Sequence, residues 1–172
     1  LEWMLEPSKR VSFVDQLEDS IAGLKLAIIP SLLEGCQSGI LDSFDKSISI
    51  FRGLGVEITE LEPMPDYIDM RGKLSPIATA EGSTYIESIL RDNKELIGER
   101  VRAQMLTGLD ASLHDYVRAL DYRREVEASF ENALHTHQID GYIIPTCTQV
   151  AEPITDDLEN LGKKVRNTSV FN

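Results

Sequence analysis

Three short apolar segments, separated by stretches with helical periodicity, constrain the fold of this chain more than any other feature. They cover residues 24–30, 56–61 and 139–145, and a proline closes or closely follows each one. Proline cannot donate to a strand ladder, so these segments are typical of short strands. A strand that returns after a helical excursion normally joins the same sheet by a right-handed crossover. We therefore predict an α/β fold of three layers, with a small, mostly parallel sheet in the order 2-1-3 flanked by helices.

The first helix is expected between the first two strands. Residues 31–41 contain two glycines and are predicted to form a loop. Asp42 or Ser43 then serves as the N-cap of the helix, and Gly55 is expected to end it as a C-cap glycine. The apolar residues of this helix share one face and are Phe44, Ile48, Phe51 and Leu54.

The next hundred residues are predicted to be largely helical. Residues 74–90 have a helical apolar pattern, and Pro76 is expected at the first helical position, where its missing N–H costs little. A second helical pattern starts at Gly98 and pauses at Gly108. It resumes over residues 113–134 with a period near 3.6, which predicts the longest helix of the chain, with roughly 25 residues.

Length and charge limit the domain organisation and the partners. The 172 residues suffice to bury a core, and we predict a lead-in segment with a short helix over residues 1–22 and a single α/β domain over residues 23–172. The net charge of -12 argues against nucleic acid as a partner, because that affinity depends on Lys and Arg contacts to phosphates. No apolar run approaches the roughly 20 residues that span a bilayer, so no membrane partner is expected. Cys36 and Cys147 are few and far apart in the sequence, so they suggest no disulfide framework. A cytoplasmic location is therefore expected.

Sequence motifs for familiar cofactor, metal and nucleophile chemistry are missing. The chain has no G-x-S-x-G nucleophile turn and no glycine-rich phosphate loop, so no cofactor is predicted. Cys36 lies between two glycines after the first strand, but a reactive thiol needs an imidazole or cationic neighbour, and we interpret this segment as a flexible loop. His135 and His137 cannot complete a four-coordinate metal site. They are expected at the end of the long helix, where they favour the helix dipole.

Two segments near the third strand resemble a known enzyme family. Residues 140–146, Asp-Gly-Tyr-Ile-Ile-Pro-Thr, and residues 151–154, Ala-Glu-Pro-Ile, resemble the D-x-x-x-x-P-T and A-x-x-I segment of the amidase signature family. Further segments resemble the family in the same order along the chain, and they are residues 23–30, 51–58, 80–83, 102–108, 115–123 and 167–172. The resemblance therefore covers residues 23–172.

The resemblance implies a hydrolase that acts on the carbon–nitrogen bonds of small-molecule carboxamides. Family members use a serine nucleophile, a second serine in a cis peptide and a lysine, within a stretch similar to G-G-S-S-G-G-S. This chain has no such stretch, so neither Lys25 nor Lys46 takes the lysine role and no catalytic residue is assigned. We therefore predict the C-terminal portion of an amidase, from after the signature region, that is inactive alone.

Three residues are predicted to lie near the substrate in an intact relative. The P-T loop begins with Pro145 and Thr146, and in the family it runs close to the catalytic serines. The resemblance therefore places Thr146 and Thr148 near those serines. Gln104 lies where glutamine-handling relatives carry an arginine that holds a carboxylate. A neutral amide pairs poorly with a carboxylate. Gln104 therefore favours a general small-amide hydrolase over a subunit of a tRNA-dependent amidotransferase.

Two alternative functions stay open at this point. One is a free-standing α/β ligand-binding or interaction module, with a crevice between residues 31–41 and the P-T loop at the carboxyl ends of the strands. The other is a thiol enzyme that uses Cys36 and requires a histidine within hydrogen-bond reach. A fragment of a larger fold would expose a sheet edge and an apolar face, so a homodimer is also expected.

Overall fold

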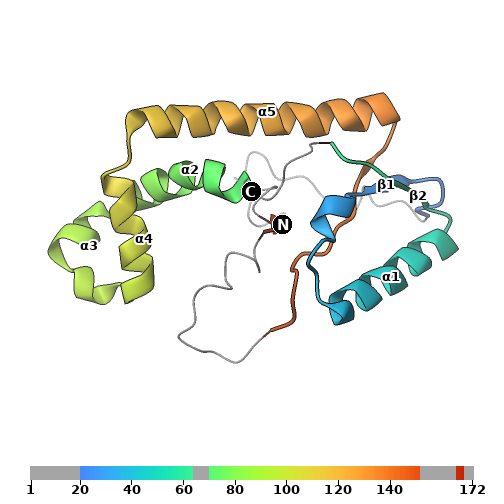
Figure 1. Ribbon diagram of the computed structural model, residues 1–172, viewed down its shortest axis with the longest axis horizontal. Helices are drawn as coiled ribbons and strands as arrows, with labels where there is room; N and C mark the ends of the chain where they lie inside the picture. Colours follow the sequence, from blue (N-terminus) through green and yellow to red (C-terminus); the bar gives the residue numbers. More distant parts are fainter. Residues whose placement is uncertain (1–19, 64–69, 152–165, 169–172) are drawn as a thin grey trace.

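The fold is built on a parallel three-stranded sheet. The computed structural model describes residues 20–63, 70–151 and 166–168 (Figure 1). The strands are β1 (Lys25–Ile28), β2 (Glu57–Glu60) and β3 (Gly141–Tyr142). β1 lies between the other two and pairs with both in parallel, with Leu26 opposite Ile58 on one side and Gly141 on the other. The predicted parallel sheet with the order 2-1-3 is confirmed.

The strands are shorter than the apolar segments that predicted them. β1 stops at Ile28, because Ile29 is already the N-cap of a 3-10 turn that Pro30 opens. β3 contains two residues, although the backbone N–H of Ile143 still donates to Ala27 O at 2.9 Å beyond the end of the strand. Pro30 therefore ends β1 two residues before the end of the apolar segment 24–30.

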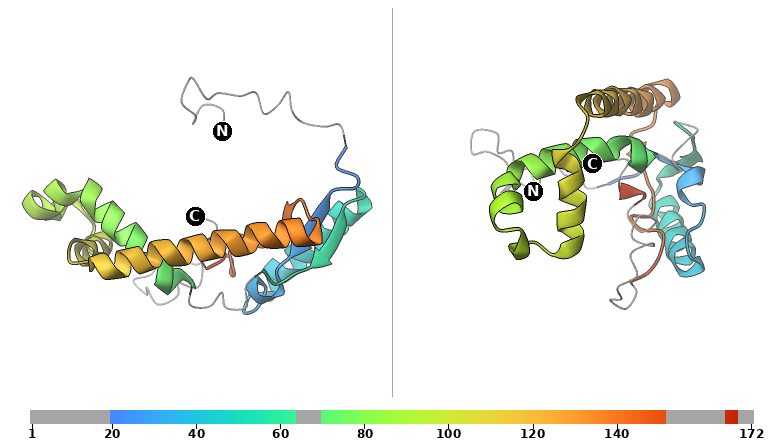
Figure 2. Two further views of the ribbon diagram at one scale, coloured as in Figure 1. Left: turned by 90° about the horizontal axis from the view of Figure 1, so that it is seen from above. Right: turned by 60° about the vertical axis from the view of Figure 1, so that its left-hand side comes forward.

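Helices surround this sheet and extend away from it. They are η4 (Pro30–Leu32), α1 (Ser38–Gly53), α2 (Met70–Tyr85), α3 (Glu87–Asp92), η5 (Lys94–Leu96), α4 (Glu99–Leu109) and α5 (Leu113–His137). Figures 1 and 2 show α2, α3 and α4 grouped at one end of the molecule and the sheet with α1 at the other. The long helix α5 connects the two ends, because it packs against α2 and then leads into β3.

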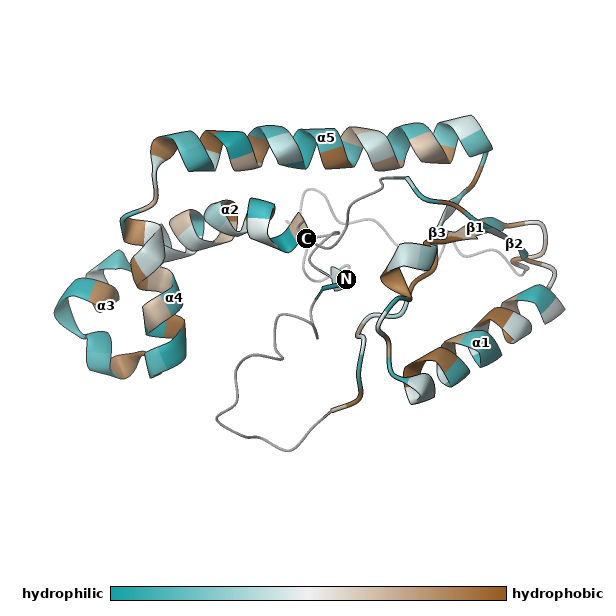
Figure 3. Ribbon diagram, viewed as in Figure 1, coloured by the Kyte–Doolittle hydropathy of each residue, from teal (hydrophilic) through white to brown (hydrophobic). Residues whose placement is uncertain are grey.

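Two apolar clusters hold helices against the sheet. The cluster on the α1 side consists of Ile28, Phe44 and Ile48, with Leu33, Ile58 and Ile143 packed against it. The cluster on the α5 side consists of Ile29, Leu32, Met70, Val126 and Phe130, with Leu74, Tyr122, Tyr142 and Ile144 packed against it. Figure 3 shows that hydrophobic and hydrophilic residues alternate along α1 and α5, as in helices that bury one side.

Helix α1 begins four or five residues before the predicted N-cap. Its first residue is Ser38 and its N-cap is Gln37, whereas the sequence predicted a loop over residues 31–41 and an N-cap at Asp42 or Ser43. The N–H of Gln37 donates to Thr148 O at 2.8 Å, which fixes the start of the helix from a segment more than a hundred residues away. The prediction of the start was wrong because a local pattern does not contain this contact. The predicted end is confirmed, since Gly55 follows the C-cap with a φ of 87°.

Helix α2 contains Pro76 in its interior and not at its first position. The described helix begins at Met70. The prediction that it starts with Pro76 at the first helical position was therefore wrong. Met70 is fully buried and Leu74 packs against the same cluster, so burial of this first turn favours the helical backbone. Pro76 cannot donate a hydrogen bond within this helix, and packing of the preceding turn outweighs that local loss.

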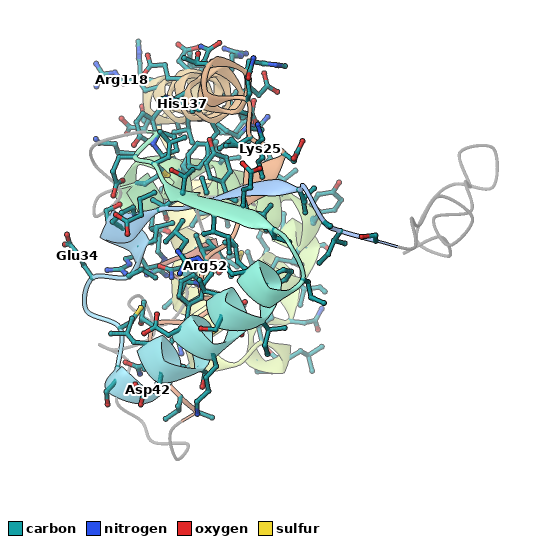
Figure 4. The ribbon with its side chains drawn as sticks, turned by 90° about the vertical axis from the view of Figure 1, so that its right-hand side faces the viewer. Lys25, Glu34, Asp42, Arg52, Arg118 and His137 are labelled. Atoms are coloured by element: carbon teal, nitrogen blue, oxygen red, sulfur yellow. The ribbon has the colours of Figure 1, made fainter. Side chains whose placement is uncertain are left out.

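Helix α5 is the longest described helix and has the predicted length. It contains 25 residues. Ser112 caps its start through a hydrogen bond from His114 N to Oγ at 3.1 Å, and Gln138 ends it with a φ of 53°. His135 and His137 lie in its last turn, as the sequence predicted, and Figure 4 shows His137 at the surface.

Some predictions fall on residues outside the described ranges. The short helix of the lead-in segment was predicted within residues 1–22, most of which lie outside them. The segment 151–154 and the end of the segment 167–172 also lie outside them in large part. In the ranges that the structure describes, no helix combines the length and the apolar character needed to cross a membrane.

Candidate functional site

The P-T loop follows β3 and is fastened to the start of α1. Pro145 and Thr148 are buried, whereas Thr146 between them is exposed. Besides the bond from Gln37 N to Thr148 O, the side-chain Oε1 of Gln37 accepts a hydrogen bond from Val150 N at 3.1 Å. The loop therefore lies at the carboxyl ends of the strands, where ligands bind in many open α/β sheets.

Asp140 begins the motif that precedes this loop, and its side chain has a structural role. Its Oδ2 accepts a hydrogen bond from Lys25 N at 2.8 Å, and its own N–H donates to Lys25 O at 2.8 Å. These two bonds join the start of β3 to the start of β1. Asp140 thus fixes the register of β3 against β1, and this register places the loop that follows β3.

Asn167 ties the loop to the turn after β1. Its side chain is fully buried, and Nδ2 donates to Leu32 O at 3.1 Å and to Pro145 O at 2.7 Å. The neighbouring Arg166 donates from Nη2 to Leu32 O and to Glu34 O at 3.0 and 2.8 Å. Asn167 belongs to a motif segment that supports the resemblance, and the sequence predicted no role for it. The only signal for such a role was its place in that motif.

Cys36 lies beside this junction without the surroundings of a nucleophile. Its Sγ donates to the backbone carbonyl of Leu32 at 3.6 Å and not to a histidine. Partial burial raises the pKa of the Cys36 thiol, and the positive charge of Arg166 lowers it by a smaller amount. The net rise disfavours the thiolate that a nucleophile needs. The geometry therefore argues against the thiol-enzyme interpretation.

The two cysteines are expected to react with iodoacetamide at different rates. Near neutral pH, exposed Cys147 should be alkylated about tenfold faster than Cys36, because burial and a raised pKa reduce access and thiolate content at Cys36. Alkylation of Cys36 should accelerate as the pH rises towards its raised pKa. Peptide mass spectrometry over time measures both rates, with Cys36→Ala as the assignment control. Faster labelling of Cys36 would contradict this prediction.

Gln104 lies in a different place from the two threonines. It is exposed on α4 and lines a pocket of about 360 Å³ between α2, α4 and α5. The lining residues of this pocket are Arg71, Leu74, Ser75, Ile77, Ala78, Glu81, Gln104 and Arg123. Neither Thr146 nor Thr148 belongs to this lining. The structure thus places the three predicted substrate residues in two regions, one at the sheet and one among the helices.

Glu81 lines this pocket and also a neighbouring one, where it pairs with a tyrosine. Tyr116 on α5 donates from its hydroxyl to Glu81 Oε1 on α2 at 2.9 Å. This hydrogen bond is the main cause of the raised pKa of Tyr116, with desolvation and the charge of Glu81 adding to it. The adjacent pocket of about 310 Å³ is lined by both residues and by Gly108. The pair therefore bridges α2 and α5, and its Glu81 is common to the two linings.

Metal-ligating side chains were sought in the described part of the chain. Within residues 20–63, 70–151 and 166–168, no three His, Cys, Asp or Glu side chains are grouped so that they could hold a metal ion. The polar atom that stands out near the P-T loop is Gln149 Nε2, which is buried without a hydrogen-bond partner in the described structure. The arrangement offers hydrogen bonds and charge to a ligand.

Comparisons with known proteins identify the fold. No protein-family model matches the sequence, and neither does any curated protein. Among solved structures, an amidase is similar with a TM-score of 0.77 and 18% identity, over 90% of this chain and 37% of that one. A glutamyl-tRNA(Gln) amidotransferase subunit from Thermotoga maritima gives 0.64 and 20%, over 91% of this chain and 33% of that one.

A bacterial aryl acylamidase of the amidase signature enzyme family is also similar. Its TM-score is 0.73 at 13% identity, over 94% of this chain and 37% of that one. The chain thus spans about a third of the length of these solved structures. The resemblance that the motifs predicted is confirmed at the level of the fold. This chain therefore has the fold of a part of the amidase signature enzymes.

Proposed function

We propose that this chain is the C-terminal portion of an amidase that hydrolyses the carbon–nitrogen bonds of carboxamides. One observation carries the proposal: two motif segments that are distant in sequence bind each other, through the hydrogen bond from Asn167 Nδ2 to Pro145 O. The similar fold of an amidase and of an aryl acylamidase supports it. In this proposal residues 23–172 form one α/β domain, preceded by the lead-in segment of residues 1–22.

The proposed role of this portion is to shape the substrate pocket. Exposed Thr146 on the fastened P-T loop is the group best placed to face reacting atoms supplied by another part of the enzyme. Buried Thr148 holds the loop to α1 through its backbone carbonyl. Gln104 contributes a neutral amide to the pocket among the helices. The serines and the lysine of catalysis lie outside this sequence, which has no glycine- and serine-rich signature.

Further partners are part of the same proposal. The carboxamide substrate binds to the longer enzyme, and the net charge of -12 supports no nucleic-acid face. Exposed apolar residues such as Ile50, Leu54 and Leu113 support self-association of this chain when it is isolated. Sedimentation velocity tests the homodimer, and a monomer over the whole concentration range would contradict it.

Amide hydrolysis by two polypeptides tests the proposed function. Amine release from a panel of aliphatic and aryl carboxamides is measured for this chain and for the longer gene product that contains it. We expect release only by the longer product, with the Cys36→Ala variant of that product fully active. Turnover by this chain that Cys36→Ala abolishes would overturn the proposal, and so would inactivity of the longer product on every carboxamide.

A further inference from the structure

The pocket lined by Gln104 carries positive charge in an acidic protein. Its lining contains two arginines, Arg71 of α2 and Arg123 of α5, and one carboxylate, that of Glu81. The Glu81 carboxylate already accepts the hydroxyl hydrogen of Tyr116. The chain as a whole has a net charge of -12, so a pocket with more cations than anions departs from the rest of the molecule.

The two guanidinium groups can accept a further anionic partner. Within the described ranges, Arg71 has no ion pair, since the pairs found there involve other residues. The Nε of Arg123 lies 3.4 Å from Glu127 Oε1, with 46% and 59% of the two side chains exposed. Exposed pairs of this kind contribute little free energy, so a ligand carboxylate competes with Glu127 readily. Among the described residues, therefore, nothing prevents either arginine from binding a ligand carboxylate.

An apolar stripe of α2 lines the same pocket as the arginines. Leu74, Ile77 and Ala78 are spaced by three and four residues, so they lie on one face of α2. Ile77 is buried, with 8% of its surface exposed. Gln104 adds an amide from the facing helix α4. At about 360 Å³ the pocket has the size of a small-ligand site.

We propose that this pocket binds a small organic acid with a hydrocarbon body. Arg71 and Arg123 hold its carboxylate, because guanidinium groups offer charged, planar donor pairs that match carboxylate geometry. The apolar stripe of α2 contacts the hydrocarbon body, and the Gln104 amide hydrogen-bonds a neutral carbonyl or amide of the ligand. The proposal rests on the proposed function and adds to it that the amide substrate carries an acid group.

This assignment changes what Gln104 means for specificity. The neutral side chain at position 104 argued against recognition of a carboxylate when it was considered alone. The structure brings Arg71 and Arg123 from two other helices into the same pocket. The positive charge is thus supplied from α2 and α5, and the neutral residue on α4 does not exclude an acidic substrate.

Binding of two matched probes to the full chain tests the proposal. Affinities for 4-phenylbutyrate and for its uncharged carboxamide, 4-phenylbutanamide, are measured by NMR titration. We expect the acid to bind about tenfold more tightly than the amide. Arg71→Gln and Arg123→Gln should each weaken binding of the acid about three- to tenfold and leave binding of the amide unchanged, and added salt should weaken only the acid.

Arg124→Gln is the matched control for this experiment. Arg124 is the next residue of α5, pairs with Asp121 as Arg123 pairs with Glu127, and is not in the pocket lining. This variant should bind both probes like the original chain. That result distinguishes the loss of a ligand contact from the effect of removing one positive charge. Circular dichroism checks that all three variants fold, as expected for exposed side chains. Equal weakening by Arg124→Gln would overturn the proposal, as would equal affinity for acid and amide or absence of binding.

The binding experiment and the hydrolysis experiment fail independently. Acid binding that depends on Arg71 and Arg123, combined with an inactive longer product, would retain the pocket and overturn the hydrolase proposal. Hydrolysis of neutral carboxamides by the longer product without preference for acid-bearing ones, and with no effect of Arg71→Gln on KM, would retain the hydrolase and overturn the inference that its substrate carries an acid group. The two proposals therefore receive separate answers.

Discussion

Replacing Gly108 with alanine is expected to lower the free energy of unfolding by about 2 kcal/mol or more. Gly108 is buried near the end of α4, where this helix crosses α2. A Cβ at this position would overlap the backbone carbonyl of Thr79 and would lie 2.7 Å from Ser83 Oγ. A backbone carbonyl inside a helix cannot rotate away as a side chain can, so α2 and α4 must separate.

The measurement is urea unfolding, with Gly39→Ala as the control. Gly39 is also helical, in α1, but a Cβ there meets no atom within 4 Å. Alanine should therefore stabilise that helix by up to about 1 kcal/mol through its higher propensity. Gly108→Ala with the same small gain would show that the two helices are not in close contact.

The same substitution should also weaken binding of 4-phenylbutyrate. Gly108 lines the pocket of about 310 Å³, and α2 lines both that pocket and the pocket of Gln104, so a shift of α2 changes both.

Replacing Asn167 with leucine is expected to cost about 3 kcal/mol of unfolding free energy. Leucine is at least as large as asparagine, so the change removes hydrogen bonds and leaves little cavity. Asn167 Nδ2 donates to the carbonyls of Leu32 and Pro145, and the side chain is fully buried. Leu32 O retains its bond from Arg166, but Pro145 O loses the Asn167 bond in a buried position. An unsatisfied buried acceptor carries its full desolvation cost.

An exposed asparagine provides the control for this loss. Asn93→Leu at the end of α3 should change the unfolding free energy by less than about 0.5 kcal/mol, because its side chain is exposed. Urea unfolding of the two variants gives the difference. A similar small effect at both positions would mean that Asn167 does not hold the P-T loop. In the longer gene product, Asn167→Leu should also lower kcat/KM, since the loop that carries Thr146 would lose its tie to the turn after β1.

The order of the strands in the sheet could be predicted because it follows from patterns between residues that are close in the sequence. Each strand is a short apolar segment closed by a turn residue, and the crossover rule then orders the segments. The long helix α5 was predicted for the same reason, because its apolar period extends over many turns. Gly55 likewise marked the end of α1 through a backbone conformation that glycine adopts at low cost.

The errors lie where a distant contact decides a local structure. Helix α1 starts early because Gln37 binds Thr148, and α2 extends back past Pro76 because Met70 is buried against α5 and the turn after β1. The site shows the same division. Thr146, Thr148 and Gln104 came from motif positions, whereas nothing in the sequence links Arg71 to Arg123.

The sequence by itself determined the order of strands, the length of the longest helix and the family resemblance, because hydrophobic period, turn chemistry and motif spacing act between near neighbours. Only the tertiary structure decided which motif residues hold the P-T loop in place, through Asn167 and Pro145. It also decided that α2, α4 and α5 enclose one pocket with two arginines. Packing brings together side chains that are distant in sequence, and no local pattern encodes those distances.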